Sequence, residues 1–265
     1  MRTLRLVVEY DGTGYCGWQR QRGSGASGLP SVQATLEAAV QAVTGEAVKV
    51  VGAGRTDAGV HACGQVASLV TGSRIPAERF APALNAHLPP DVRVLEAQEA
   101  PDGFHARYDA ISRTYRYLIL NRPAPSALLR HRAYHVPEPL DVEAMRQALA
   151  PFVGRQDFAA YRGVGSRTRT TVCTLLEADV AQAGSRISVT LTADRFLRHM
   201  VRMLVGTLVR VGTGRLPPEA PYEFLQDADT RRTGPTLPPH GLYLVRVDYP
   251  PGKLWRLAPA RLEGG

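Results

Sequence analysis

Apolar residues follow two different spacings along the first half of the chain. Arg2–Tyr10 alternates with the period of two that is typical of a strand. A helical stripe of apolar residues follows, and we expect Ser31 to cap this helix and Gly45 to end it. Further runs predict another helix that begins at Pro76 and strands at 47–51, 66–70 and 91–98. The predicted order of this half is βαββαβ.

The second half repeats that order. Its pattern predicts a helix capped by Asp141, a strongly apolar helix at 196–211, a short helix near 218–228, and strands at 112–120, 168–180, 186–193 and 241–249. We therefore predict an α+β fold of two ferredoxin-like halves, residues 1–105 and 106–265. The halves would form one broad, mostly antiparallel sheet with helices on one face and an active-site cleft between them.

Composition is that of a folded protein outside the membrane. The chain has 265 residues, of which 44% are hydrophobic, enough for one large domain or two small ones. No apolar run approaches the roughly 18 residues of a membrane span. The first residues alternate like a strand and lack a secretory cleavage pattern. We expect a cytoplasmic protein.

The charge balance favours an anionic partner. Net charge is +8, with a pI near 9.7, and nucleic acid is the first partner to consider. Lys49 and Lys253 are the only lysines, so arginine carries nearly all the positive charge. Arginine contacts phosphates and stacks on bases well, although genome composition or a hot habitat would give the same bias. A generally basic protein without such a partner is the alternative.

Cysteine and histidine give no sign of a metal site or a disulfide framework. The chain has three cysteines, far apart, and seven scattered histidines. An odd cysteine count with this spacing suits a reducing compartment. We expect no metal and no cofactor.

The densest group of chemically useful residues lies at 51–62, between two predicted strands. Three glycines there flank Arg55, Thr56 and Asp57. One interpretation is an ordinary turn in which Asp57 bonds its own backbone. A phosphate loop is a weaker interpretation, because no Gly-Lys-Ser/Thr follows and the loop leads toward a strand. A presented catalytic group is the third.

The residues of this loop are similar to a known signature. The string Gly-Arg-Thr-Asp-Ala-Gly-Val-His-Ala at 54–62, followed by Gly-Gln-Val at 64–66, resembles the signature loop of tRNA pseudouridine synthases of the TruA type. The string Tyr-Asp-Gly-Thr-x-Tyr-x-Gly-Trp-Gln at 10–19 resembles another part of that family. The resemblance implies that Asp57 is the catalytic nucleophile and that Arg55 holds the target nucleotide out of the stack.

Further strings extend the resemblance to nearly the whole chain. Arg-x-Tyr-x-Tyr at 113–117 implies that Tyr115, and not Tyr117, stacks on the target uracil and is a candidate to take its proton. Met-Val-Arg at 200–202 implies an ion pair between Arg202 and the catalytic Asp. Arg198 would lie one turn away on the same predicted helix, and two solvated arginines are the alternative. Asp194-Arg195 departs from the family, which usually has Asn and a small residue there.

Other residues are candidate RNA contacts. His105 and Arg107 belong to a string at 104–108 that resembles the family, although a linker with ordinary surface charges explains them equally well. Arg20 and Gln21 follow aromatic and amide residues in a mixture that suits contacts with bases and phosphates. The Gly- and Ser-rich segment 22–30 looks longer than is usual in the family.

The resemblance implies a reaction and a substrate. Uridines at positions 38, 39 and 40 of the anticodon stem-loop of tRNA would become pseudouridine, an isomerisation that needs no cofactor, with tRNA lying across a homodimer. A non-catalytic RNA-binding protein of duplicated RRM-like architecture is the main alternative. A small-molecule enzyme that binds a phosphate with the Gly-rich loop is the other.

Overall fold

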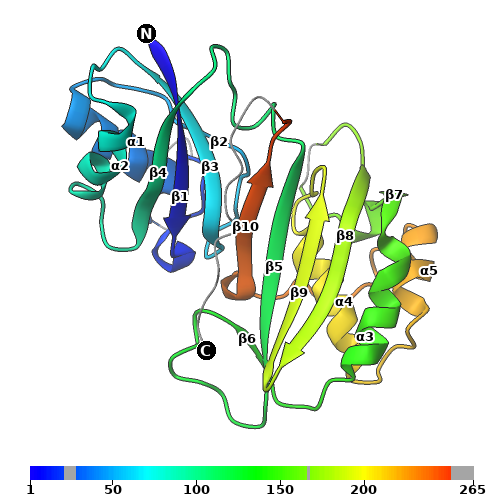
Figure 1. The fold of residues 1–265 in the computed structure, drawn as a ribbon. Coiled ribbons are helices and arrows are strands. Elements are labelled where there is room, and N and C mark those ends of the chain that lie inside the picture. Colours follow the sequence, from blue (N-terminus) through cyan, green and yellow to red (C-terminus); the bar gives the residue numbers. More distant parts are fainter. Residues whose placement is uncertain (21–27, 166–167, 252–265) are drawn as a thin grey trace. The chain divides into compact units, whose positions relative to one another are not determined.

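The computed structural model describes residues 1–20, 28–165 and 168–251. In this part of the chain the fold is α+β, with five α-helices and ten strands in one mostly antiparallel sheet, which confirms the predicted class. Two compact units make up the chain (Figure 1). Unit 1 holds Met1–Arg113 and the last strand from Tyr243, and unit 2 holds Thr114–Leu242. The predicted division into two ferredoxin-like halves, 1–105 and 106–265, stays a prediction.

Unit 1 has the predicted βαββαβ order. Its elements are β1 (Arg2–Tyr10), a 3₁₀ turn (Gly12–Gly14), α1 (Val32–Thr44), β2 (Val51–Gly52), β3 (His61–Thr71), α2 (Ala77–Asn85), β4 (Val92–Ala100) and most of β10 (Leu242–Asp248). The strand order is β4-β1-β3-β10, and β2 also pairs with β3. β1 is antiparallel to β3 and β4, whereas β10 is parallel to β3.

Helix α1 shows how directly local sequence sets an element. The Ser31 side chain accepts a hydrogen bond from the Ala34 N–H, and this cap satisfies one of the orphan donors at the helix start. Gly45 ends the helix in the left-handed conformation, with φ 75°, and donates to the Gln41 carbonyl. Both predicted ends are confirmed. The apolar stripe that includes Leu36 is buried against the strands.

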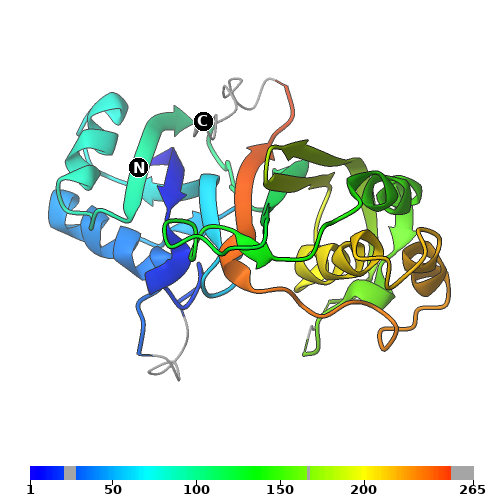
Figure 2. The ribbon, with the colours of Figure 1, turned by 90° about the horizontal axis from the view of Figure 1, so that it is seen from below.

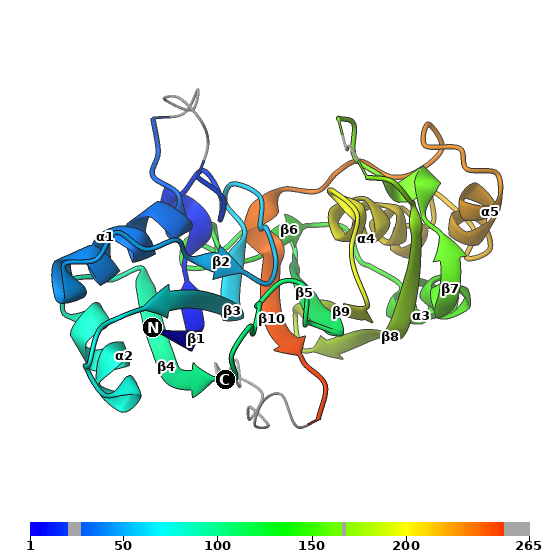
Figure 3. The same ribbon diagram turned by 90° about the horizontal axis from the view of Figure 1, so that it is seen from above.

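Unit 2 has the same general plan with additions. Its elements are most of β5 (Ser112–Asn121), β6 (Tyr134–Val136), α3 (Val142–Leu149), β7 (Gly154–Asp157), β8 (Val172–Ala183), β9 (Arg186–Ala193), α4 (Met200–Gly212) and α5 (Ala220–Gln226), with short 3₁₀ segments at Ala150–Phe152, Ala159–Tyr161 and Pro239–Gly241. The strand order is β5-β9-β8-β7, with β6 parallel to β5. In each unit the helices cover one face of the strands (Figures 2 and 3).

The strand predicted at 47–51 is much shorter, because side chains of α1 form hydrogen bonds with its backbone groups. Glu37 accepts a hydrogen bond from the Val50 N–H at 3.1 Å, and the Gln33 amide donates to the Val50 carbonyl at 2.9 Å. These groups are therefore unavailable to a neighbouring strand, and regular pairing begins only at Val51.

The apolar helix of unit 2 begins four residues later than predicted. His199 precedes it in the left-handed conformation, with φ 60°, and α4 starts at Met200. The expectation that Arg198 and Arg202 share a helix is therefore wrong, because Arg198 lies in the preceding turn. Its carbonyl accepts a hydrogen bond from the Gly163 N–H at 2.8 Å. Arg202 stays on the first turn of α4.

None of the helices in the described residues is long and apolar enough to cross a bilayer.

Candidate active site

The loop between β2 and β3 is fixed by backbone hydrogen bonds at both ends. On the β2 side, the Ala53 N–H donates to the Val66 carbonyl at 2.8 Å. In the middle, the Trp18 N–H donates to the Thr56 carbonyl at 3.1 Å, and at the end the Val60 N–H donates to the Asp57 carbonyl at 3.2 Å. The loop is therefore a defined turn, held between β3 and the segment that follows β1.

Two buried polar side chains hold the loop from beneath. The Tyr10 hydroxyl and the Thr56 hydroxyl are 2.8 Å apart. Gln65, fully buried on β3, accepts from the Gly54 N–H at 3.1 Å and donates to the Gly54 carbonyl at 2.8 Å. Tyr10 stands where the β1–β3 register shifts after Val8, and such a bulge redirects a side chain. The sequence patterns gave Tyr10 and Gln65 no role in the site.

The segment after β1 touches the loop so closely that only glycine fits at one position. Gly17 has φ 105°, and a Cβ there would lie 2.6 Å from the Thr56 carbonyl oxygen. Any side chain would push Thr56 and the residue after it outward, and the backbone conformation itself would be strained. Gly17 therefore helps to position the backbone of the loop at Asp57.

Asp57 and Arg55 reach solvent while the residue between them does not. Thr56 is buried, Asp57 is half-buried and Arg55 is exposed. This alternation presents a carboxylate and a guanidinium two residues apart on a fixed turn. A carboxylate in such a place is able to act as a nucleophile or as a base.

The histidine of the signature loop has a structural place. His61 is buried and stacks on Tyr243 of β10, with ring centroids 4.8 Å apart. Its Nδ1 atom lies 3.1 Å from the Gly12 backbone nitrogen and 3.0 Å from an Asp11 carboxylate oxygen. His61 thus ties β3 to the turn after β1 and to the final strand, and it belongs to the framework of the loop.

In unit 2 the two tyrosines of the Arg-x-Tyr-x-Tyr string differ in surroundings. Tyr115 packs edge-on against Phe196, with ring centroids 5.1 Å apart. Tyr117 is completely buried, and its hydroxyl donates to the Pro238 carbonyl at 2.8 Å. Burial raises the pKa of Tyr117 far above its ordinary value, while nearby Arg202 acts in the opposite direction. Tyr117 is thus a packed core residue.

Arg202 is held by the segment that precedes β10. Its Nε donates to the Leu237 carbonyl at 2.7 Å, and its own carbonyl accepts from the Leu237 N–H at 3.3 Å. The side chain is half-buried. This two-way pairing orients the guanidinium from the first turn of α4.

Three of the predicted RNA-contacting or substrate-binding residues of unit 1 line one cavity. Arg55, His105 and Arg107 lie around a space of about 170 Å³, together with Lys49 and Tyr108, which the sequence patterns did not single out. The structure therefore brings the 104–108 string to the side of the signature loop. Tyr108 belongs to the 104–108 string but was given no role there, and Lys49 carries no sequence signal of its own.

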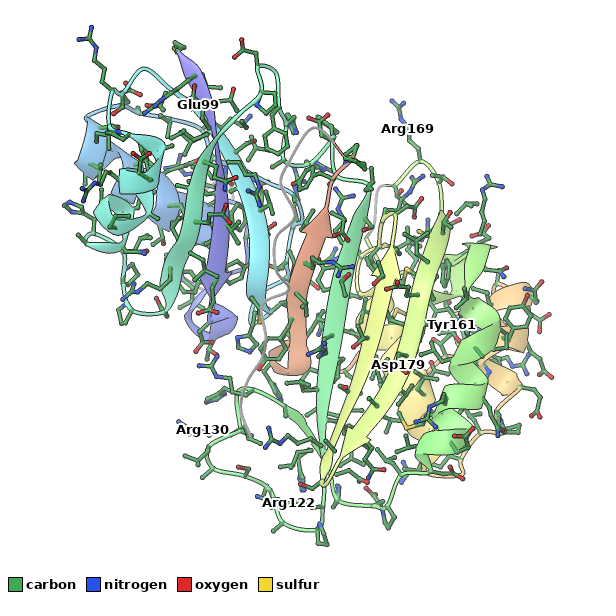
Figure 4. The ribbon with its side chains drawn as sticks, in the orientation of Figure 1. Glu99, Arg122, Arg130, Tyr161, Arg169 and Asp179 are labelled. Carbon is green, nitrogen blue, oxygen red and sulfur yellow. The ribbon has the colours of Figure 1, made fainter. Side chains whose placement is uncertain are left out.

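The other predicted RNA contacts lie elsewhere. Arg20 is exposed and forms an ion pair with Glu37, with 3.6 Å between nitrogen and oxygen. Gln21, and residues 22–27 of the Gly- and Ser-rich segment, lie outside the described residues. Exposed arginines also stand on loops of unit 2, among them Arg122, Arg130 and Arg169 (Figure 4). Among the described residues, no group of three or more His, Cys, Asp or Glu is placed to hold a metal ion.

Comparison with known proteins assigns this arrangement to a family. The family model described as tRNA pseudouridine synthase matches residues 6–109 and 148–250, which include the signature loop, Arg202 and the final strand. The chain belongs to the tRNA pseudouridine synthase family. It is therefore an enzyme, an isomerase of the pseudouridine synthase kind, and the resemblance predicted from the motifs is confirmed.

Individual members of the tRNA pseudouridine synthase family match over nine tenths or more of their length. The tRNA pseudouridine synthase A of Acetivibrio thermocellus is 45% identical over 249 residues, covering 94% of this chain and 100% of the relative. That of Methylobacterium radiotolerans is 45% identical over 258 residues, covering 96% and 100%. That of Neisseria gonorrhoeae is 43% identical over 245 residues, covering 92% and 91%.

Proposed function

We propose that this enzyme converts uridine to pseudouridine at positions 38, 39 and 40 in the anticodon stem-loop of tRNA, with Asp57 as the nucleophile. The observation that carries the proposal is the fixed signature loop. Tyr10 binds the buried Thr56 hydroxyl and Gln65 binds the Gly54 backbone, while Arg55 and Asp57 reach solvent. A catalytic carboxylate needs such a fixed support, because small misplacements of a reacting group are costly.

The reaction rearranges atoms that are already present. The bond from N1 of uracil to C1′ of ribose breaks, and a bond from C5 to C1′ forms. C5 loses its proton and N1 gains one, so substrate and product have the same composition. A carboxylate that bonds covalently to one fragment keeps it in place while the base turns. Asp57 would bond either to C1′ of the ribose or to C6 of the uracil.

The remaining predicted residues take supporting roles in this proposal. Tyr115 stacks on the target base and is the candidate to remove the C5 proton. Arg55 fills the gap that the flipped nucleotide leaves, which offsets part of the few kcal/mol that flipping costs. Arg202 would form the ion pair with Asp57 that the motif match implies. The motif match supports these three assignments.

The substrate proposal also rests on charge. A net charge of +8, carried almost entirely by arginine, suits a large polyanion such as tRNA. Arg20, His105 and Arg107 are proposed contacts with the RNA outside the target nucleotide. A cytoplasmic homodimer, with tRNA lying across both copies, completes the proposal.

The experiment is a map of pseudouridine along an unmodified tRNA transcript after incubation with the purified enzyme. We expect pseudouridine at positions 38 to 40 and nowhere else. The Asp57→Asn variant should form none while binding the transcript within about threefold of the wild type. Asp102→Asn, a change in an exposed loop, is the matched control and should convert normally.

Three other outcomes would contradict parts of this proposal. Conversion at uridines outside the anticodon stem-loop would contradict the proposed substrate site. Conversion that survives Asp57→Asn would exclude Asp57 as the nucleophile. Tight binding of tRNA with no conversion by the wild type would favour the non-catalytic RNA-binding alternative.

A further inference from the structure

The strongest feature that the proposed function leaves unused is an exposed aromatic side chain on a fixed turn. Tyr108 is 77% exposed, the most exposed large aromatic residue in the described part of the chain. It follows Arg107 in a turn between β4 and β5. An exposed tyrosine needs little explanation when its segment is loosely held, but this one stands on a turn that the rest of unit 1 fixes.

The base of the turn is anchored in the core. Ala106 is fully buried, its N–H donates to the Ser68 hydroxyl at 3.1 Å, and its carbonyl accepts from the Tyr249 hydroxyl at 2.6 Å. Phe104 packs on the Tyr249 ring, with centroids 5.3 Å apart. Phe104 and Ala106, which precede the exposed residues, are therefore held by Ser68 of β3 and by Tyr249, just after β10.

The top of the turn is organised around His105. The N–H groups of Arg107 and Tyr108 both point to its Nδ1 atom at 3.2 Å. Nδ1 is then the acceptor, which leaves the ring proton on Nε2. An Asp109 carboxylate oxygen accepts from the His105 N–H at 3.0 Å. These bonds close the turn on itself and fix the direction of Tyr108.

The Tyr108 ring is already part of a stack. His105 lies on it with ring centroids 4.3 Å apart and an interplanar angle of 29°. The Arg107 guanidinium lies 5.8 Å from the ring centroid, close enough for a cation–π contact. A preorganised aromatic platform of this kind offers a flat surface at little entropic cost, and nucleobases stack on such surfaces without regard to sequence.

The cavity beside this stack is strongly basic. Lys49, Arg55 and Arg107 line it, and within the described ranges none of the three forms an ion pair. Gln33 also lines the cavity, and its amide is already bound to the Val50 carbonyl and to Glu37. The carboxylate of Glu37 is in turn paired with Arg20. The positive charge on the cavity walls is thus available to an anion.

The size of the cavity limits what it can hold. About 170 Å³ is well below the roughly 300 Å³ at which sites for drug-sized ligands begin. A cavity of this size is large enough for a phosphate group and too small for a large cofactor. The combination of a flat aromatic platform and a small basic cavity matches one nucleotide of a polynucleotide.

We propose that this surface, Tyr108 and His105 with Lys49, Arg55 and Arg107, binds one unpaired nucleotide of the RNA that flanks the target uridine. The base stacks on Tyr108, and its phosphate lies in the cavity near Lys49 and Arg107. The inference rests on the proposed function, because Arg55 belongs both to this surface and to the loop that carries Asp57. An RNA strand that reaches the loop from this side passes over the platform.

The test separates stacking from charge. Tyr108→Ala removes the platform at an exposed position, and Tyr108→Phe keeps it. We expect Tyr108→Ala to weaken binding of an unmodified tRNA transcript about tenfold, without changing the salt dependence, and Tyr108→Phe to bind normally. Lys49→Ala should instead lower the salt slope by roughly 0.7–0.9. Leu95→Ala and Arg79→Ala, at exposed positions of unit 1, are the matched controls and should have no effect.

Pseudouridine formation by the wild type is measured with the same transcript. Absence of conversion by the wild type would reject the proposed function. If the wild type converts the transcript and Tyr108→Ala binds it as tightly as the wild type, this inference is rejected while the proposed function stands. A Tyr108→Ala variant that binds tRNA normally but changes its sedimentation would also reject it, and would assign the platform to contact between copies of the chain.

Discussion

The side chain of Gln65 pairs with the peptide of Gly54 as a neighbouring strand would. Its amide oxygen accepts from the Gly54 N–H at 3.1 Å and its amide nitrogen donates to the Gly54 carbonyl at 2.8 Å. The same amide nitrogen lies 3.5 Å from the Tyr10 hydroxyl, which in turn binds Thr56. The fully buried Gln65 side chain thus supports Gly54 directly and Thr56 through Tyr10.

Replacing Gln65 by leucine should loosen the loop. The change leaves the N–H and carbonyl of Gly54 without their partners, at a cost of roughly 1–3 kcal/mol in the free energy of unfolding. We expect the rate of pseudouridine formation to fall at least tenfold, with tRNA affinity nearly unchanged. Urea unfolding and single-turnover conversion measure the two effects. Gln41→Leu, at an exposed position of α1, is the control. A variant with lowered stability and a normal rate would show that Gln65 does not position Asp57.

The 3₁₀ turn after β1 offers a matched pair of glycines. A Cβ on Gly12 would lie 2.0 Å from the Val60 carbonyl oxygen, whereas a Cβ on Gly14 would meet only an Asp91 carboxylate oxygen at 3.9 Å. Gly12→Ala must therefore displace the end of the signature loop, and we expect it to cost about 1–3 kcal/mol of stability and most of the activity. Gly14→Ala should change neither. Thermal unfolding and conversion rate, measured side by side, decide this.

The elements of this fold were predictable where the signal is local. Ser31 and Gly45 mark the ends of α1 by capping chemistry that acts within a few residues. The loop residues Arg55 and Asp57 were found from a contiguous string, which needs no knowledge of the fold. Asp141 likewise caps α3 as expected, accepting from the Ala144 N–H at 2.9 Å.

What escaped prediction depends on partners far away in the sequence. β3 begins at His61, five residues before the predicted strand, because Tyr10 and Tyr243 from opposite ends of the chain pair with Ala62 and His61. Tyr108 became a candidate only when the structure placed its turn beside Arg55. No periodicity in the sequence encodes such a meeting of distant segments.

The two tyrosines of β5 should respond differently to loss of their hydroxyl groups. Tyr115→Phe keeps the ring against Phe196, so tRNA affinity should stay within about twofold. If its hydroxyl removes the C5 proton, as proposed, conversion should fall by roughly 10²-fold or more. Tyr117→Phe loses the bond to the Pro238 carbonyl and should cost about 1 kcal/mol of stability while conversion persists. An unchanged rate in Tyr115→Phe would exclude its hydroxyl as the base.

The cysteines should differ in reactivity and in their effect on stability at high pH. Burial raises the pKa of the Cys173 thiol from 9.0 to about 11, and the Asp194 carboxylate acts in the same direction. Because the folded state holds this proton more tightly, its contribution to stability is fully present below about pH 9 and is lost as the pH rises through 11.

At pH 8 we therefore expect a thiol reagent to label half-buried Cys16 first and Cys173 only on unfolding. Cys173→Ser, whose hydroxyl does not titrate in this range, should remove that part of the loss of stability between pH 9 and 11. Labelling followed by peptide mass mapping gives the order. Rapid labelling of Cys173 in the folded enzyme would contradict its assigned burial.

Salt dependence should sort the arginines by their contact with RNA phosphates. Arg107 lines the basic cavity, whereas Arg20 lies outside it and is paired with Glu37. If each contacts one phosphate, Arg107→Ala and Arg20→Ala should each make the negative slope of log binding constant against log salt shallower by roughly 0.7–0.9. The double variant should make it shallower by the sum. Arg20→Ala should also free Glu37, whose negative charge then weakens binding further at low salt. Filter binding of a tRNA transcript across a salt series measures all three, with Arg79→Ala as the control. A residue whose replacement leaves the slope unchanged does not contact the RNA backbone, whatever its position on the surface.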